Sequence, residues 1–268
     1  LFFIGWAIVC TFIPLLNTEN AALWRLWAEI TPLLSIIAFT IVFWLIEKKQ
    51  VKLNLIKNPA TGLGVGVFGG ILWLGCTVVI LFLSNVIKFE GCNQVPMLII
   101  WLIASTLNVI MQELLVRGYL YQMIKQKHNV IAATIVTTTL FTVMHGGAFE
   151  AGVIPVLNVV TMSLMMTVVL EYTGSIIAPI IMHAIWNGIG SIILGGVSLA
   201  DDYPHLLNVT FNGNDILSGG VCKIEGSIVV LVINIFMIGV FAILKKRKHA
   251  KFQSSGEIES AHEFEVSF

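Results

Sequence analysis

Long apolar runs fill most of the sequence, and they constrain the fold more than any other feature. An α-helix needs roughly 20 apolar residues to cross a bilayer core about 30 Å thick. Eight runs approach this length, although the second reaches it only if its helix begins near Leu23. The runs are 1–16, 33–46, 62–86, 96–123, 130–145, 152–172, 176–197 and 227–244. The sequence therefore predicts an all-α, polytopic membrane bundle of about eight transmembrane helices.

The charge content supports this class and excludes several others. Only 11% of the 268 residues are charged and the mean hydropathy is +0.93, whereas a soluble domain has roughly 25% charged residues. The formal net charge is zero, which argues against a nucleic-acid partner because such a partner requires a basic surface. The four cysteines include no CxxC pair, so neither a disulfide scaffold nor a zinc ribbon is expected.

The distribution of Lys and Arg between the connections predicts the orientation. Eleven basic residues fall in connections on one side of the bundle and three on the other. Basic residues gather on the cytoplasmic side of membrane proteins, so both termini are expected in the cytoplasm. The eleven are Lys48, Lys49, Lys52, Lys57, Lys125, Lys127, Lys245, Lys246, Arg247, Lys248 and Lys251, and the three are Arg25, Lys88 and Lys223.

The sequence predicts a single transmembrane domain, 1–251, followed by a polar cytoplasmic tail, 252–268. The part that carries the polar motifs is 96–198, and no internal repeat or linker divides the chain. Cys92 and Cys222 both fall in outward-facing connections. They can form a disulfide in an oxidising compartment or remain free thiols, and the sequence leaves both alternatives open.

A few polar side chains interrupt the apolar runs. Such residues are costly in a bilayer and mark a function or a partner. Glu113 and Arg117 are four residues apart, so they share a helix face and are expected to form an ion pair in which Arg117 is structural. Gln112 points about 100° away from Glu113, on the face that it shares with Asn108.

Two further runs contain polar residues at a comparable depth. His183 and Asn187 are four residues apart and present two hydrogen-bonding groups in one direction. At 1.5 Å per residue, Gln112, His145, His183 and Asn187 all lie near the middle of the bilayer. We expect these groups, from three helices, to meet in one buried pocket. The alternative is that each makes a separate hydrogen bond between helices.

Such a pocket would suit peptide hydrolysis by an activated water molecule. A carboxylate and a His can activate water, and a His with an Asn can stabilise the oxyanion of an attacked amide. No Ser or Cys within the runs has an obvious partner for acyl-enzyme chemistry. We expect no cofactor, and the alternative is a zinc ion held by Glu113, His145 and His183.

The polar residues resemble three ordered motifs of one protein family. Residues 112–117 resemble its EExxxR motif, Phe141 to His145 its FxxxH motif, and His183 to Asn187 its HxxxN motif. This is the CPBP family, also called Abi, which contains CAAX prenyl proteases and bacteriocin-processing or self-immunity enzymes. Each motif alone is weak, so the resemblance depends on the order and separation of all three.

The resemblance implies an intramembrane endopeptidase of the glutamic type, formerly called a metalloprotease. In this family the first glutamate of EExxxR activates water, the FxxxH histidine assists it, and the HxxxN pair stabilises the oxyanion. A peptide or prenylated-peptide substrate, a bacterial cell membrane and, as an option, a membrane-protein partner are also implied. The catalytic positions carried over are Gln112, Glu113, His145, His183 and Asn187, with Arg117 as the structural partner of Glu113.

Position 112 departs from the motif at its general base. The amide of Gln112 has no basicity near neutral pH and cannot take a proton from water. Three explanations stay open: an engineered inactivation, a natural pseudoenzyme, or a base role for Glu113, although its pairing with Arg117 would weaken it as a base. The leading hypothesis is an endopeptidase that Gln112 inactivates. The alternatives are a non-catalytic bacteriocin self-immunity or scaffold protein on the same fold, and a small transporter, which the lack of an inverted repeat disfavours.

Overall fold

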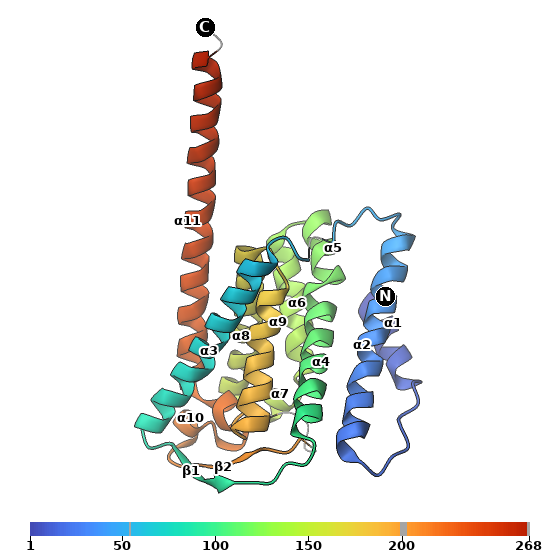
Figure 1. Ribbon diagram of the computed structural model, residues 1–268, viewed down its shortest axis with the longest axis vertical. Coiled ribbons are helices and arrows are strands. Elements are labelled where there is room, and N and C mark those ends of the chain that lie inside the picture. The colour runs from blue at the N-terminus through green and yellow to red at the C-terminus, as the bar shows by residue number, and fades with distance from the viewer. Residues whose placement is uncertain (54, 199–202, 267–268) are drawn as a thin grey trace.

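Helices that run along one common direction make up most of the protein (Figure 1). The computed structural model describes residues 1–53, 55–198 and 203–266, with side chains as far as residue 250. Within these residues, five helices are long and apolar enough to cross a membrane, and three apolar helices are shorter. The structure is mostly helical with one small sheet, which is consistent with the predicted all-α membrane bundle. The count of eight spanning helices is not, because runs 1–16, 130–145 and 176–197 form only the shorter helices.

The local sequence explains where several helices begin. Asn20 and Asn129 cap α2 and α6, because their side chains accept hydrogen bonds from the backbone amides of Leu23 and Ala132. Pro59 begins α3, at a position where a helix does not need the missing N–H. The helices are α1 Phe2–Thr11, α2 Ala21–Ile46, α3 Pro59–Leu83, α4 Leu98–Arg117, α5 Tyr119–Lys127, α6 Val130–Met144, α7 Gly147–Ala151, α8 Val153–Thr173, α9 Ile177–Ala184, η1 Ile185–Ile193, α10 Asp215–Ser218, η2 Gly220–Gly226 and α11 Ile228–Val266.

Three predicted spans differ from the helices that form. The second helix begins at Ala21, close to the start near Leu23 that would give it full length, and not at residue 33. The run 96–123 is divided at Gly118 into α4 and α5, where an added Cβ would lie 2.2 Å from the carbonyl oxygen of Leu114. Only glycine fits at such a close approach. The run 176–197 begins as the α-helix α9 and continues as η1, a π-helix.

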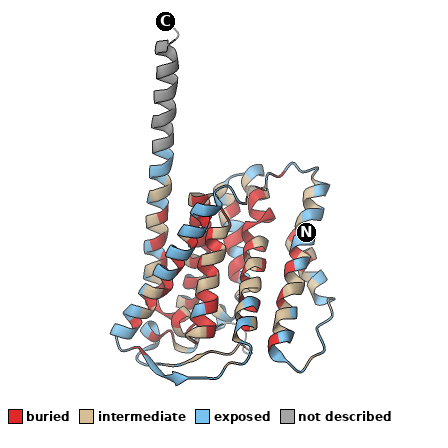
Figure 2. Cartoon of the chain, in the orientation of Figure 1, coloured by how far each residue is buried: buried red, intermediate tan, exposed pale blue. Residues whose placement is uncertain are grey.

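The core is formed by closely packed central helices. Figure 2 shows buried residues concentrated in this centre and exposed residues on the outer helix faces. Trp73 of α3 stacks on Trp186 of η1, with ring centroids 3.9 Å apart. Large apolar side chains such as Phe68 and Phe236 are exposed, at 72% and 65%, as expected of surfaces that face lipid.

A small two-stranded antiparallel sheet, called the hairpin below although its strands are far apart in the sequence, closes one end of the bundle. Strands β1 (Ile87–Cys92) and β2 (Leu207–Phe211) pair antiparallel, with an irregularity between Phe89 and Gly91. The hairpin, α7 and α10 lie at one end in Figure 1, and α5 lies at the other. We call these the hairpin end and the α5 end.

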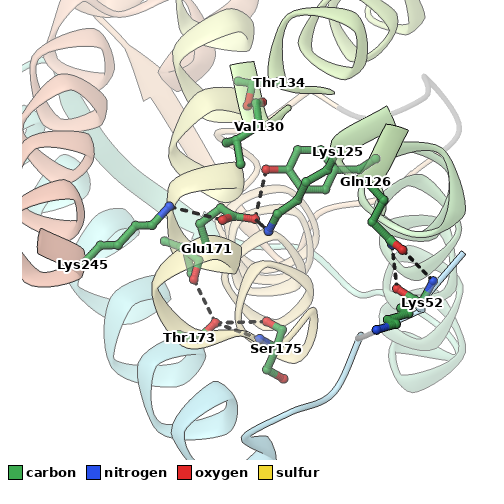
Figure 3. A network of polar contacts seen from close by, with 11 residues as sticks. Lys52, Lys125, Gln126, Val130, Thr134, Glu171, Thr173, Ser175 and Lys245 are labelled. Atoms are coloured by element: carbon green, nitrogen blue, oxygen red, sulfur yellow. Dashed lines mark hydrogen bonds and ion pairs between the residues drawn. The ribbon is translucent and has the colours of Figure 1, made fainter. Parts of the chain in front are cut away.

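Glu171 of α8 joins three helices near the α5 end (Figure 3). Its carboxylate accepts hydrogen bonds from the Nζ atoms of Lys125 and Lys245, at 2.5 and 3.2 Å, and from the Tyr121 hydroxyl at 3.1 Å. These contacts hold α5, α8 and α11 together where the bundle meets the basic connections.

Two further expectations concern the tail and the cysteines. The backbone of α11 continues as a helix to Val266, so it runs through most of the predicted tail, whose residues 267–268 lie outside the described residues. Cys92 and Cys222 are both free thiols. Of the two alternatives that the sequence left open, the structure has the unpaired one.

Candidate active site

One cavity of about 430 Å³ lies inside the bundle and brings the motif residues together. Gln112, His145, His183 and Asn187 all line it, so the expected convergence of these side chains is observed. Glu113 lies behind the cavity wall and reaches the site through His183. The pocket is therefore built by α4, the end of α6 and the α9–η1 helix, as the matched depths predicted.

Gln112 lines the cavity and keeps one acceptor atom without a partner among the described residues. Its Nε2 donates to Oδ1 of Asn108 at 2.6 Å, and Nδ2 of Asn108 donates to Oε2 of Glu29 at 2.8 Å. This chain fixes the orientation of the Gln112 amide. Its Oε1 is buried and has no hydrogen-bond partner among the described residues. Gln112 thus offers a hydrogen-bond acceptor where the family motif has a base.

Each carboxylate oxygen of Glu113 makes one polar contact. Its Oε2 accepts from Nη1 of Arg117 at 2.9 Å, and its Oε1 lies 2.9 Å from Nδ1 of His183. Both side chains of the ion pair are fully buried, and Nη2 of Arg117 also donates to the carbonyl and hydroxyl oxygens of Ser163. The predicted ion pair is confirmed. Both oxygens of Glu113 are engaged, and the side chain is 0% exposed and does not line the cavity, which disfavours it as the base.

The two histidines keep one ring nitrogen each for a ligand. His145 Nδ1 lies 2.7 Å from the carbonyl oxygen of Phe141. Because a carbonyl only accepts, Nδ1 carries the proton and neutral His145 retains a lone pair on Nε2. His183 donates Nδ1–H to Glu113 in the same way, as in an Asp–His pair of a hydrolase. The Phe141 ring packs against both imidazoles, at centroid distances of 4.3 and 6.0 Å.

Asn187 reaches the cavity from a π-helix. His183 is near the end of α9, and Asn187 is the third residue of η1, where hydrogen bonds run to i+5. The two side chains are 1% and 5% exposed and both line the cavity. No residue that the structure describes makes a hydrogen bond to the Asn187 side chain, which leaves its amide available to a ligand.

Two carboxylates in the cavity wall were missed by the sequence analysis. Glu29 of α2 is 5% exposed and accepts from Nη1 of Arg25 and the hydroxyl of Tyr203, each at 3.3 Å. Glu225 of η2 accepts from the Ser198 amide at 3.0 Å. Glu29 precedes the predicted start of its helix and Glu225 lies in a predicted outer connection. Glu29 falls within the second helix only if that helix begins near Leu23, and this earlier start is the one sequence signal that would have indicated it.

The side chains do not fit the zinc alternative. No group of three His, Cys, Asp or Glu residues in the described part of the chain is arranged to hold a metal ion. Glu113, the carboxylate ligand of that alternative, has both oxygens engaged. The Nε2 atoms of His145 and His183 remain free, which would give two nitrogen ligands but no third ligand from the described residues.

Comparison with known proteins agrees with the motif positions. Residues 94–189 match the family model of the Rce1-like type II CAAX prenyl endopeptidases. This segment contains all three motifs and is consistent with the CPBP family of CAAX proteases. At the level of the family, the match supports an intramembrane endopeptidase in a multi-pass membrane protein. Searches of curated proteins and of solved structures found no match.

Proposed function

We propose that this protein is built as an intramembrane endopeptidase that hydrolyses a peptide bond with an activated water molecule. One observation carries the proposal. Nε2 of His145, Nε2 of His183 and the Asn187 amide are the unengaged groups of three side chains that line a single cavity. A base and two groups able to bind an oxyanion are the minimum that amide hydrolysis without a covalent intermediate requires.

The proposed reaction uses each of these groups once. His145 Nε2 takes a proton from the water as the hydroxide attacks the carbonyl carbon, beside the Gln112 side chain in the cavity wall. The Asn187 amide donates a hydrogen bond to the resulting oxyanion, and so does His183 in its doubly protonated form, in which Nε2 carries a proton while Nδ1–H stays bonded to Glu113. Breakdown of the tetrahedral intermediate breaks the C–N bond, and His145 returns its proton to the leaving amine. Glu113 keeps the His183 ring in place throughout.

Gln112 limits the rate in this proposal. In the family motif a glutamate stands at this position, and its carboxylate would be a second proton acceptor beside His145. With an amide there, His145 alone must take the proton. The engaged oxygens of Glu113 support neither a base role for it nor zinc ligation, so the open question is whether Gln112 is an engineered or a natural change.

The second candidate is a non-catalytic bacteriocin self-immunity or scaffold protein on the same fold. The amide at position 112 is the observation that favours it. Such a protein would bind a peptide or a membrane-protein partner in the cavity without cutting it. Both candidates place the protein in a bacterial cell membrane, with an apolar peptide or a prenylated peptide as ligand.

Restoring the carboxylate tests the proposal. Gln112→Glu changes the side-chain volume little and adds a second proton acceptor beside His145, so cleavage of a cognate peptide should rise by about 10²–10⁴-fold. Purified protein in detergent and a panel of apolar and prenylated peptides provide the assay. Gln50→Glu makes the same chemical change outside the cavity and should have no effect.

Two further variants separate the explanations. Adding His145→Ala to Gln112→Glu should remove the gain. If Glu113 were the base, Glu113→Gln would abolish activity while Gln112→Glu changed little. If neither the parent nor Gln112→Glu cuts any peptide of the panel, the endopeptidase proposal fails and the non-catalytic candidate stands.

A further inference from the structure

The cavity opens toward the hairpin end. Among the residues that line it, Gly146, Gly147 and Ser198 are exposed, and they belong to α7 and to the connection after η1. Tyr203 and Cys222 of the wall also come from segments at this end. The mouth of the cavity is therefore formed by the connections that lie around the β1–β2 hairpin (Figure 1).

A buried layer closes the cavity toward the α5 end. It contains Glu113, Arg117, Phe141 and Ser163, each 0% exposed, and continues to Tyr121 of α5, which is also 0% exposed. The guanidinium of Arg117 lies 5.2 Å from the centre of the Phe141 ring and bonds to Ser163. These side chains form a buried, hydrogen-bonded layer on the α5 side of the site.

The two ends differ strongly in charge. Connections and helix ends at the closed, α5 end carry most of the basic side chains, namely Lys48, Lys49, Lys52, Lys57, Lys125, Lys127, Lys245, Lys246, Arg247 and Lys248. The hairpin end carries Arg25, Lys88 and Lys223. It also carries acidic side chains such as Glu90, Glu150 and Asp215. Because basic residues gather on the cytoplasmic side, the closed end is the cytoplasmic one.

We propose that the cavity is entered from the extracytoplasmic side, and that its ligand is an apolar peptide segment presented there rather than a prenylated tail held in the cytoplasm. Large apolar side chains in the wall, among them Trp73, Met144, Met162 and Trp186, suit such a segment. The inference rests on the proposed function in one respect only, which is that this cavity receives the substrate.

Accessibility of single cysteines in intact cells tests the side of entry. Ser198→Cys, in a background in which the four native cysteines are replaced by serine, places a thiol at the mouth. Lys48→Cys places one at the closed end. A charged, membrane-impermeant methanethiosulfonate should modify Ser198→Cys in intact cells, and Lys48→Cys only after permeabilisation. A mass tag added to the remaining thiols after denaturation gives the readout.

Two results would overturn the proposal. One is modification of Lys48→Cys but not of Ser198→Cys in intact cells. The other is a Ser198→Cys thiol that stays unreactive even after permeabilisation while native Cys92, kept as a single cysteine on the exposed hairpin, reacts. Cys222 as a single cysteine reports on the wall deeper in the cavity. None of these measurements requires peptidase activity.

Sealed vesicles test the substrate. The Gln112→Glu protein is prepared in right-side-out and in inverted membrane vesicles, and each is given a membrane-impermeant apolar peptide from the same panel. Cleavage in right-side-out vesicles alone supports the inference, and cleavage in inverted vesicles alone refutes it. Absence of cleavage in both, and after detergent, would refute the endopeptidase function and leave the side of entry to the cysteine result.

Discussion

At the scale of single residues, the site combines saturated and unsaturated polar groups. Glu113 has every oxygen engaged, whereas Gln112, the residue before it, keeps a buried oxygen without a partner. A buried acceptor without a partner costs about 1–3 kcal/mol. A ligand that donates a hydrogen bond to Gln112 would therefore recover part of that cost on binding.

Arg117 should be essential for stability. Removing one partner of a buried ion pair leaves an uncompensated charge and costs about 3–5 kcal/mol. Arg117→Leu leaves Glu113 with a single partner, so thermal unfolding in detergent should occur at a clearly lower temperature, or the variant should fail to fold. Arg247→Leu, an exposed position on α11, is the matched control and should be neutral. Equal stability of Arg117→Leu and the parent would contradict a structural role for the pair.

The sequence predicted the pairing and the convergence of these residues but not the whole wall of the cavity. Spacing of four along a helix was sufficient for Glu113 with Arg117. Glu29 and Glu225 could not be found in this way, because their positions depend on where α2 begins and on how the connection before α11 folds back. The hydrogen bond from Asn108 to Glu29 joins helices far apart in the sequence, which no local pattern indicates.

At the scale of the elements, glycines determine how closely α3 approaches α9. A Cβ added to Gly66 would lie 2.8 Å from Cβ of Ile181 and 3.1 Å from the carbonyl oxygen of Ala178. One added to Gly64, two residues earlier on the other face, would meet nothing within 4 Å. Small residues allow such close backbone packing in membrane bundles, and α9 in turn carries His183.

Gly66→Ala should therefore destabilise the protein, whereas Gly64→Ala should not. Overpacking of this kind costs about 1–3 kcal/mol, and backbone atoms of α9 cannot move aside as a flexible side chain could. Unfolding temperatures of the two variants in the same detergent provide the comparison. A Gly66→Ala protein as stable as Gly64→Ala would show that α3 and α9 separate readily.

The sequence did not predict where the helices are interrupted. Gly118 and the junction of α9 with η1 both lie inside continuous apolar runs of the sequence, so hydropathy places neither a break nor a π-helix there. The hairpin was missed for a related reason. Its two strands are separated by more than 100 residues in the sequence, and their pairing depends on the helices that bring them together.

At the scale of the whole molecule, no covalent link holds the hairpin end together. All four cysteines are free, so alkylation of the unfolded, unreduced protein should modify every one of them. Unfolding temperatures with and without a reductant should be equal. A stabilising effect of oxidation would instead reveal a bridge between Cys92 and Cys222. The class of fold was predictable from hydropathy alone, because lipid requires each spanning segment to satisfy its own backbone hydrogen bonds.

The buried layer beneath the cavity also has an electrical consequence. A polar pocket that enters the bundle from one side lets the bulk potential of that side extend inward as far as His183, so the layer around Arg117 and Phe141 must withstand nearly the full membrane voltage. Moving one elementary charge through 100 mV costs about 2.3 kcal/mol. In this protein the fall in membrane potential would occur over the short thickness of the buried layer. A proton released by hydrolysis would return to the side from which the water came. The proposed hydrolysis would therefore carry no proton across the energised membrane.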